Sequence, residues 1–395
     1  KTEMRGDGIH IHCRRDKRFG MRGGGSGCRG MLNRWCRRVV EDIPLFGRRT
    51  LVHIEYAQVF INSGQVEVEE LPFVASGSRV TNRFARLISG MCRYMPISAV
   101  ALYVGLRWNT VKNIDKAWME KTLPMKHPSD LEGLEYIGVD EVARAKGHDY
   151  ITVVYDLGTG DLLWVHEGRT AAVLGQFLEA LDEETAKAIK AVAMDMGLPF
   201  QCAVKEWLPD ADIVFDRFHV MQMYNKALAQ VRRSQFRKAD ADGKDMLKGS
   251  RYLLLRNKCN LKEDQQPRLD ALLAANEPLN KVYVLKEQLQ ALWLDQPISF
   301  EQMQADLEAW CKLADESGLA PIQRVAASLR RHAKGICNYA KHPITNARVE
   351  AGNVAIGLIR KRARGIRDVR YFILKVFQIA TPPDTNALRS GIITV

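Results

Sequence analysis

The sequence predicts a mixed α/β fold: a five-stranded mixed sheet that is interrupted by an all-helical insertion and preceded by a β-hairpin and a helix-turn-helix. Three observations predict it. Residues 136–215 alternate between β-rich and helical segments, residues 220–341 show only helical periodicity, and residues 81–121 contain three short helical segments around a glycine turn. A chain of 395 residues has enough length for several domains and a sizeable core.

The composition points to a polyanionic partner. The 58 Lys and Arg exceed the 46 Asp and Glu, so nucleic acid is the first expectation, an acidic membrane surface the second, and a basic protein without a special partner the alternative. A hydrophobic content of 46% excludes wholesale disorder. No membrane span is expected, because the longest nearly apolar run covers only residues 97–106. The eight cysteines form no C-x-x-C pair and predict reduced thiols in a cytosolic protein.

Residues 1–50 are basic, with thirteen Lys and Arg against five Asp and Glu and a glycine-rich patch at 20–30. Because apolar periodicity is absent before Val39, this segment is expected to be a poorly ordered arm. Two interpretations stay open, a DNA-contacting tail and a degenerate or wrongly translated leader. Residues 51–80 follow as a β-hairpin, in which residues 51–61 and 65–70 alternate and Asn62-Ser63-Gly64 form the turn.

Residues 81–123 are expected to form the helix-turn-helix domain. One helix covers residues 83–95, a second starts at Pro96 and breaks at Gly105, and a third runs from Trp108 to about residue 121. The third helix offers side chains that bond phosphates and base edges. The candidates are Arg107 and, at helical positions i, i+3, i+4 and i+7 of one face, Asn109, Lys112, Asn113 and Lys116. The alternative is a plain helical hairpin that touches no DNA.

After a linker at residues 121–135, residues 136–215 show three strands, then helix, strand, helix, strand. The strands are expected at 136–143, 150–157, 162–167, 188–194 and 212–215, and the helices at 171–181 and 199–208. Short turns favour antiparallel hairpins and long crossovers favour parallel pairing, which together give the ribonuclease-H-like order. The α/β domain would comprise residues 124–222 and 342–383, separated by the helical insertion 223–341 and followed by a tail, 384–395.

Three acidic residues fall where this fold would bring them together. Asp140 lies within the first strand, Asp195 ends the fourth, and Glu350 lies near the start of the last long helix, expected at 346–363. Since the first and fourth strands are adjacent and a late helix packs beside them, the three carboxylates could hold two divalent cations, Mg²⁺ or Mn²⁺. Taken singly, Asp140 could pair within the sheet, Asp195 could cap a helix, and Glu350 could be a solvated helix residue.

A second polar cluster follows the fifth strand. Asp216 and His219, in the sequence DRFH, could steady the site by hydrogen bonds to its ligands. The alternative is a strand-end turn with a satisfied core histidine. Asp216 is also a rival for the second carboxylate, and Asp195 is preferred because its strand lies next to the first.

The residues in combination resemble the ISL-three family of bacterial insertion-sequence transposases, from about residue 42 to 377. The resemblance runs through GVDEVARAKGHDYITVVYDL at 138–157, AMDMGLPF at 193–200, DIVFDRFHV at 212–220, LLLRNKCNL at 253–261, YVLKEQLQALW at 283–293 and TNARVEAGNVAIGLIRKRARGIRD at 345–368. It implies that Asp140, Asp195 and Glu350 are the acidic triad and that residues 223–341 are an insertion domain. It also implies that a C-terminal basic run lies near DNA phosphates: Arg360, Lys361, Arg362, Arg364 and Arg367.

The N-terminal part departs from the family. Similar members usually carry a zinc ribbon with two C-x-x-C pairs before the helix-turn-helix. Here DIPLFGRR at 42–49 and LPFVAS at 71–76 match its flanks, but Ile61 to Gly64 occupy the position of the second pair. Residues 51–80 are therefore expected to be a degenerate zinc ribbon without bound zinc, which leaves the activity of this copy open.

The resemblance implies a Mg-dependent DDE transposase that cleaves at the ends of an insertion sequence and joins the 3′-hydroxyl to target DNA. Its partners would be double-stranded DNA, as terminal inverted repeats and as target, and at least one more copy of the chain on that DNA. A cytoplasmic, nucleoid-associated bacterial protein without a membrane partner is expected. Two alternatives stay open, a ribonuclease-H-like nuclease without strand transfer and an inactive, transposase-derived DNA-binding protein.

Overall fold

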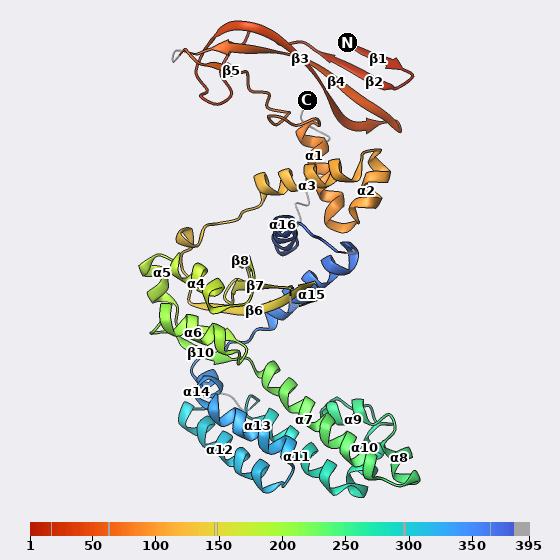
Figure 1. The fold of residues 1–395 in the computed structure, drawn as a ribbon, viewed down its shortest axis with the longest axis vertical. Helices are drawn as coiled ribbons and strands as arrows, with labels where there is room; N and C mark the ends of the chain where they lie inside the picture. Colours follow the sequence, from red (N-terminus) through yellow and green to blue (C-terminus); the bar gives the residue numbers. More distant parts are fainter. Residues whose placement is uncertain are drawn as a thin grey trace. The chain divides into compact units, whose positions relative to one another are not determined.

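The computed structural model describes residues 1–16, 18–61, 64–145, 147, 149–294, 298–363 and 365–382. The chain divides into two compact units, one made of Lys1–Met125 with Ala355–Val395 and the other of Lys126–Val354 (Figure 1). Helix α15, Ala347–Ala363, contributes residues to both units. The predicted tail at 384–395, the predicted turn residues Asn62 and Ser63, and the candidate Arg364 lie outside the described residues.

The first unit begins with a five-stranded sheet in the order β1-β2-β4-β3, with β5 paired to β4. Its two longest strands, β3 and β4, form an antiparallel hairpin. Gly47, at a φ of 71°, completes the turn between them, in a conformation that glycine adopts without strain. The strands are β1 Thr2–Arg5, β2 Gly8–Cys13, β3 Met31–Leu45, β4 Arg48–Phe60 and β5 Val66–Val68.

The prediction of a poorly ordered arm at residues 1–50 is wrong, because this segment supplies β1, β2 and β3. Some of its arginines pair with carboxylates: Arg15 lies 2.5 Å from Glu69, and Arg49 lies 2.7 Å from Glu41. Backbone pairing along β3 and β4 adds order that apolar periodicity does not reveal. The hairpin predicted for residues 51–70 is present as β4 and β5, which pair antiparallel.

Three helices follow, as the sequence predicts: α1 Asn82–Tyr94, α2 Ile97–Val104 and α3 Trp108–Thr122. Helix α1 begins after Thr81, whose side chain accepts a hydrogen bond from the amide of Phe84. Helix α2 ends at Gly105, which adopts a left-handed φ of 71°. The three helices enclose a small apolar core that includes Phe84, Ile88, Val100 and Val111.

Helix α16, Val369–Ala380, packs against α1 and α3 within this first unit. Its placement corrects the assignment of all of residues 342–383 to the α/β domain. The ammonium of Lys375 lies 3.1 Å from Asp115, and the Tyr371 hydroxyl donates a hydrogen bond of 2.6 Å to the same carboxylate. Ser89 donates to the other oxygen of Asp115 at 2.7 Å. All four side chains are buried, so the docking of α16 rests on a satisfied polar network as well as on apolar contact.

The second unit contains the predicted mixed sheet, in the order β10-β9-β6-β7-β8. Strands β6, β7 and β8 pair antiparallel, whereas β9 pairs parallel with both β6 and β10. This is the ribonuclease-H-like order that the sequence predicts. The strands are β6 Tyr136–Ala145, β7 Asp149–Asp156, β8 Leu162–Glu167, β9 Ala191–Met194 and β10 Asp212–Phe215.

The helices between these strands lie where the sequence places them, with one addition. Helix α4, Ala171–Glu179, packs against β8 and against α6, Leu198–Trp207. Helix α5, Glu183–Ala188, was not expected, and it shortens the strand that the sequence starts at residue 188. A 3-10 turn, Pro128–Asp130, precedes the sheet.

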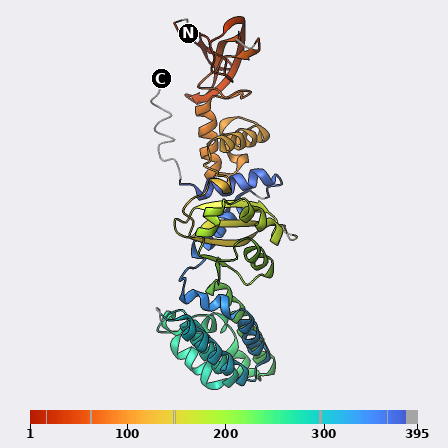
Figure 2. The same cartoon turned by 90° about the vertical axis from the view of Figure 1, so that its left-hand side faces the viewer.

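The insertion after β10 is helical throughout its described residues, as predicted (Figure 2). His332 interrupts the helical segment near its end, and its ring packs edge-on against Phe215. None of the described helices has the length and apolarity to cross a bilayer. The helices are α7 Arg217–Lys238, α8 Ala241–Leu247, α9 Arg251–Leu255, α10 Gln266–Ala275, α11 Glu277–Ala291, α12 Phe300–Glu316, α13 Ala320–Arg331 and α14 Ala333–Cys337.

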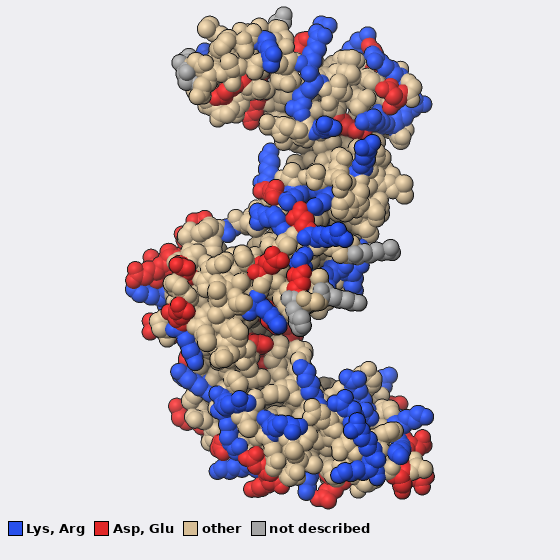
Figure 3. Space-filling view, in the orientation of Figure 1, with Lys and Arg blue, Asp and Glu red and all other residues tan. Residues whose placement is uncertain are grey.

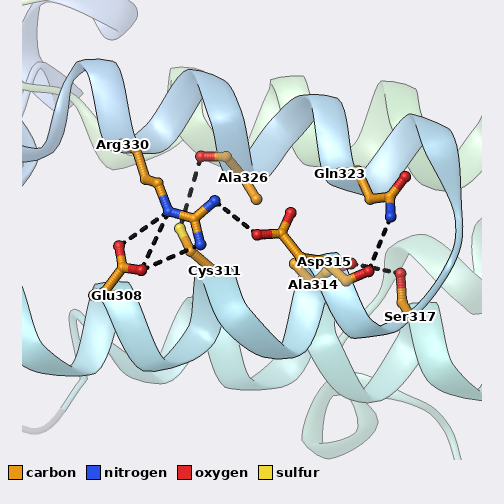
Figure 4. Close-up of polar contacts among 8 residues, drawn as sticks. All are labelled: Glu308, Cys311, Ala314, Asp315, Ser317, Gln323, Ala326 and Arg330. Atoms are coloured by element: carbon orange, nitrogen blue, oxygen red, sulfur yellow. Dashed lines mark hydrogen bonds and ion pairs between the residues drawn. The ribbon is translucent and has the colours of Figure 1, made fainter.

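Polar contacts join α12 and α13 within the insertion (Figure 4). The guanidinium of Arg330 lies 3.0 Å from Glu308 and 2.8 Å from Asp315. Gln323 donates a hydrogen bond of 2.9 Å to the carbonyl of Asp315. This side of the insertion therefore pairs its arginine with its own carboxylates.

Candidate active site

Asp140 lies in the middle of β6 and is 8% exposed. One of its oxygens accepts a hydrogen bond of 2.7 Å from the amide of Glu141, and the other accepts one of 2.6 Å from Asn353 on α15. Burial, together with the charge of Asp195, raises the pKa of Asp140, while these hydrogen bonds and the charge of His219 act in the opposite direction. The two hydrogen bonds thus orient the carboxylate, but they only partly offset the cost of burying its negative charge.

Two glycines let α15 approach the sheet closely enough to reach Asp140. A Cβ on Gly138 of β6 would lie 2.7 Å from a methyl group of Val349 on α15. A Cβ on Gly352 of α15 would collide with the hydroxyl of Tyr155 on β7. Any larger residue at either position would push α15 away, so the two glycines place the helix against the strand that carries Asp140.

Glu350 lies in the first turn of α15. Its Oε1 atom is buried and has no hydrogen-bond partner among the described residues. Burial raises the pKa of Glu350, and the charges of Asp216 and Asp140 raise it further. A buried, unpaired carboxylate oxygen beside two other carboxylates is costly unless a cation or a proton compensates it.

Asp195 directly follows β9, the strand adjacent to β6. It is half-buried, and one oxygen accepts a hydrogen bond of 2.7 Å from the amide of Gly197. Its charge acts on Asp140. The sequence analysis preferred Asp195 because its strand was expected next to the first strand of the sheet, and β9 does lie next to β6.

Asp216 caps the N-terminus of α7, and one of its oxygens accepts a hydrogen bond of 3.3 Å from the amide of Phe218. The other oxygen is buried and has no partner among the described residues. Burial raises the pKa of Asp216, and the charges of His219 and Arg217 oppose that rise. Asp216 follows β10, two strands from β6, yet its charge acts on Glu350 more strongly than that of Asp140 does.

Sequence reasoning missed Asn346, which directly precedes α15, and Asn353 within α15, and it missed the close approach of α15 to the sheet. Asn346, Glu350 and Asn353 follow the spacing i, i+4 and i+7, so they share one helical face. Asn346 lies buried, and its Oδ1 has no partner among the described residues. That spacing was the available signal. Nothing in the sequence indicated Tyr155. Burial raises the pKa of Tyr155 to about 12, and the charge of Asp140 adds to that rise.

The predicted DNA-contacting residues of the first unit are arranged in two ways. Asn109, Asn113 and Arg107 are exposed on α3. Lys112 and Lys116 are instead partly buried, and both pair with Asp368, the residue that caps α16.

The C-terminal basic run ends α15 and leads toward α16. Arg360, Lys361 and Arg367 are exposed. Arg362 donates a hydrogen bond of 2.6 Å to the carbonyl of Arg93 on α1. Lys112, Lys116 and Arg362, which the sequence assigned to DNA, therefore have intramolecular partners.

The chain matches two family models. One is described as a transposase and covers residues 137–376, and the other, described as the helix-turn-helix domain of transposase family ISL3, covers residues 69–119. The chain is 35% identical over 356 residues to the transposase for insertion sequence element IS1001 of Bordetella parapertussis, covering 89% of this chain and 86% of that one. It is 29% identical over 300 residues to the transposase for IS1557 of Mycobacterium tuberculosis, covering 70% and 66%.

Among solved structures, a chain of a simian T-cell lymphotropic virus intasome in complex with PP2A regulatory subunit B56 gamma gives a TM-score of 0.17 at 15% identity. It covers 48% of this chain and 67% of that one. The first family model alone spans more than half of the chain, and the IS1001 relative matches most of both lengths. On this basis, the chain belongs to the ISL3 family of transposases, with a helix-turn-helix DNA-binding domain ahead of its ribonuclease-H-like domain.

Proposed function

We propose that this transposase cleaves DNA at the ends of its insertion sequence and joins the freed 3′-hydroxyl to target DNA, with Asp140, Asp195 and Glu350 as its catalytic carboxylates. The observation that carries the proposal is the approach of Glu350 to Asp140. The two residues are 210 positions apart, and a hydrogen bond from Asn353 joins their elements. Asp216 and His219 act as positioning residues beside them.

The donor set fits divalent cations, Mg²⁺ or Mn²⁺. Carboxylate oxygens are the ligands that such ions prefer, and the unpartnered oxygens of Glu350 and Asp216 are buried at this edge of the sheet. The raised pKa values of Asp140 and Glu350 indicate the same uncompensated negative charge. In the described part of the chain, no three His, Cys, Asp or Glu side chains are gathered into a complete metal site.

The chain's own residues hold and orient the reacting groups. The backbone amide of Glu141 and the side-chain amide of Asn353 each hold one oxygen of Asp140 in place. The backbone amide of Gly197 does the same for one oxygen of Asp195. Tyr155 stays protonated at neutral pH, because its pKa is about 12, so it is not a general base. The chemistry that two bound cations supply to phosphodiester attack is activation of the attacking oxygen and stabilisation of the leaving one.

Recognition of the ends belongs to the helix-turn-helix. We assign base contacts to the exposed Asn109 and Asn113 of α3, and phosphate contacts to Arg107, Arg360 and Lys361. Cleavage of two ends in one reaction calls for two or more copies of the chain on the DNA. The relatives come from bacteria, so we place the reaction on chromosomal DNA in the bacterial cytoplasm.

A strand-transfer assay tests the proposal, with Mg²⁺ and oligonucleotides that carry the ends of the element. Asp140→Asn, Asp195→Asn and Glu350→Gln should each lower cleavage and joining by about 10²–10³-fold or more, the scale for removing one preorganised charged group. Binding of end DNA in EDTA should be unchanged. Glu141→Gln is the matched control, because it neutralises the neighbouring carboxylate on β6 that pairs with Arg169.

Two outcomes would change the assignment. Full activity in Asp195→Asn together with an inactive Asp216→Asn would move the second carboxylate to Asp216. Hydrolysis of the ends without joining, in protein that binds them normally, would support a nuclease and contradict strand transfer.

A further inference from the structure

The positive charge of the helical insertion is concentrated at one end. Residues 226–268, which cover most of α7 together with α8, α9 and the start of α10, contain twelve Lys and Arg against five Asp and Glu. That excess of seven is more than half of the formal net charge of +12 for the whole chain. Figure 3 shows Lys and Arg gathered over the α7–α10 end of the insertion.

Three arginines at this end have exposed side chains that form no ion pair among the described residues: Arg233 and Arg237 on α7, and Arg251 on α9. The contrast lies in the same insertion, where Arg330 of α13 pairs with both Glu308 and Asp315 (Figure 4). Unpaired guanidinium groups held close together repel one another, and a polyanion relieves that repulsion.

The unpaired arginines lie on elements that pack together. Arg233 and Arg237 follow Lys226 at spacings of seven and eleven residues, so the three share one face of α7. Helix α9, which carries Arg251, packs against α7. The three arginines therefore lie on two helices that are in contact with each other.

Buried polar groups fix α9 in place. Lys286 of α11 is 1% exposed, and its ammonium donates hydrogen bonds of 3.1 Å to the carbonyl of Leu254 and 2.5 Å to that of Arg256. The hydroxyl of Tyr283 donates to the same Arg256 carbonyl at 3.1 Å. The end of α9 is therefore held to the core of the insertion, and Arg251 is presented from a rigid support.

Exposed aromatic side chains lie among the arginines. Tyr252 is 69% exposed directly after Arg251, and Phe236 is 37% exposed directly before Arg237. Exposed cations interleaved with aromatic rings are the combination that binds phosphates and stacks on unpaired bases.

We propose that this face of the insertion, formed by Arg233, Arg237, Arg251 and Tyr252, is a second DNA-binding surface, separate from α3, that contacts the phosphate backbone without reading sequence. The occupant is a DNA segment beyond the bases read by the helix-turn-helix. The surface is independent of the catalytic carboxylates, because phosphate contacts of this kind require no divalent metal.

Equilibrium binding of the full chain to a long random-sequence duplex tests the surface, in EDTA and at several salt concentrations. The triple variant Arg233→Gln, Arg237→Gln, Arg251→Gln should bind more weakly. Its dependence of log K on log salt should become shallower by about 0.9 for each phosphate that is no longer neutralised, up to about 2.7 in all. Tyr252→Ala should weaken binding most on a duplex that carries a single-stranded gap.

The matched control is the triple variant Lys281→Gln, Lys312→Gln, Arg331→Gln. It also removes three positive charges, but from other exposed positions of the insertion. It should leave the salt slope close to that of the unmodified chain. Equal effects of the two triple variants would show that net charge alone acts, and no effect of the first would show that this face does not touch DNA; either result overturns the proposal. Since no metal is present, neither result depends on the assignment of the catalytic residues.

Discussion

Asp368 accepts a hydrogen bond of 2.8 Å from the ammonium of Lys112. Lys116 reaches the same carboxylate at 3.1 Å, and Asp368 also caps α16 by accepting from the amide of Tyr371. Burial opposes ionisation, but the hydrogen bonds from both lysines hold the pKa of Asp368 well below its usual range. The carboxylate therefore pairs with two lysines of α3 in the way that a DNA phosphate would.

Asp368→Asn should release those lysines for phosphate while keeping the helix cap, because asparagine is also a good capping residue. Affinity for random DNA should rise, and the salt slope should steepen by about 0.9 for each lysine that binds a phosphate. Fluorescence anisotropy at two salt concentrations measures both. An unchanged slope in a folded variant would mean that Lys112 and Lys116 do not face DNA.

Asn109→Ala with Asn113→Ala should erode the discrimination between end DNA and random DNA by about 1–3 kcal/mol for each base that α3 can no longer read. Both side chains are exposed on α3, so the substitutions leave the core of the domain intact. The ratio of the two affinities is the readout, and Glu120→Ala on the same helix is the control. A ratio that stays constant would sink the recognition-helix assignment.

Asp140→Asn should raise the melting temperature of the metal-free protein at neutral pH. Burial raises the pKa of Asp140, so the folded state binds this proton more tightly than the unfolded state does. The stability that this group contributes is therefore present at low pH and is lost as the pH rises through the raised pKa.

Thermal unfolding at pH 5 and pH 7 measures the effect. The advantage of the variant should be larger at pH 7, and Mg²⁺ should stabilise the unmodified chain more than the variant, because ligands stabilise the state that binds them. Glu350→Gln should behave in the same way, since burial raises the pKa of Glu350 too. A variant that melts below the unmodified chain at both pH values would contradict this account.

Lys375→Met should loosen the docking of α16 on α1 and α3. It leaves the buried Asp115 without its cation, and breaking one side of a buried ion pair costs about 3–5 kcal/mol. Hydrogen exchange of α16 and α3 should accelerate. Arg370→Met is the control, because Arg370 is exposed on the same helix and lies 3.8 Å from Glu120. Similar exchange in both variants would argue against the network as the anchor.

Purified protein should retain no stoichiometric zinc after mild chelation. The three N-terminal cysteines, Cys13, Cys28 and Cys36, lie on or between different strands of the first sheet, and none belongs to a C-x-x-C pair. Elemental analysis by mass spectrometry measures the metal content. One zinc per chain that resists chelation would contradict the expectation of a degenerate ribbon.

Periodicity and turn residues were enough to predict the mixed sheet, the three helices of the helix-turn-helix and the helical insertion, because these features are local in the chain. The same reasoning was wrong for residues 1–50, where long-range pairing of β3 with β4 and ion pairs such as that of Arg49 with Glu41 order a segment that looks disordered locally. It also missed α5, whose charged residues carry no apolar stripe.

The sequence by itself determined the family, the order of strands and helices, and the candidate carboxylates Asp140, Asp195 and Glu350, since motif and spacing are properties of the chain. Only the tertiary structure decided which groups meet. Gly138 and Gly352 bring α15 onto the sheet, Asn353 reaches Asp140, and Asp368 occupies Lys112. These contacts join residues about two hundred or more positions apart, and burial and charge act through distance in space, which the order of residues does not contain.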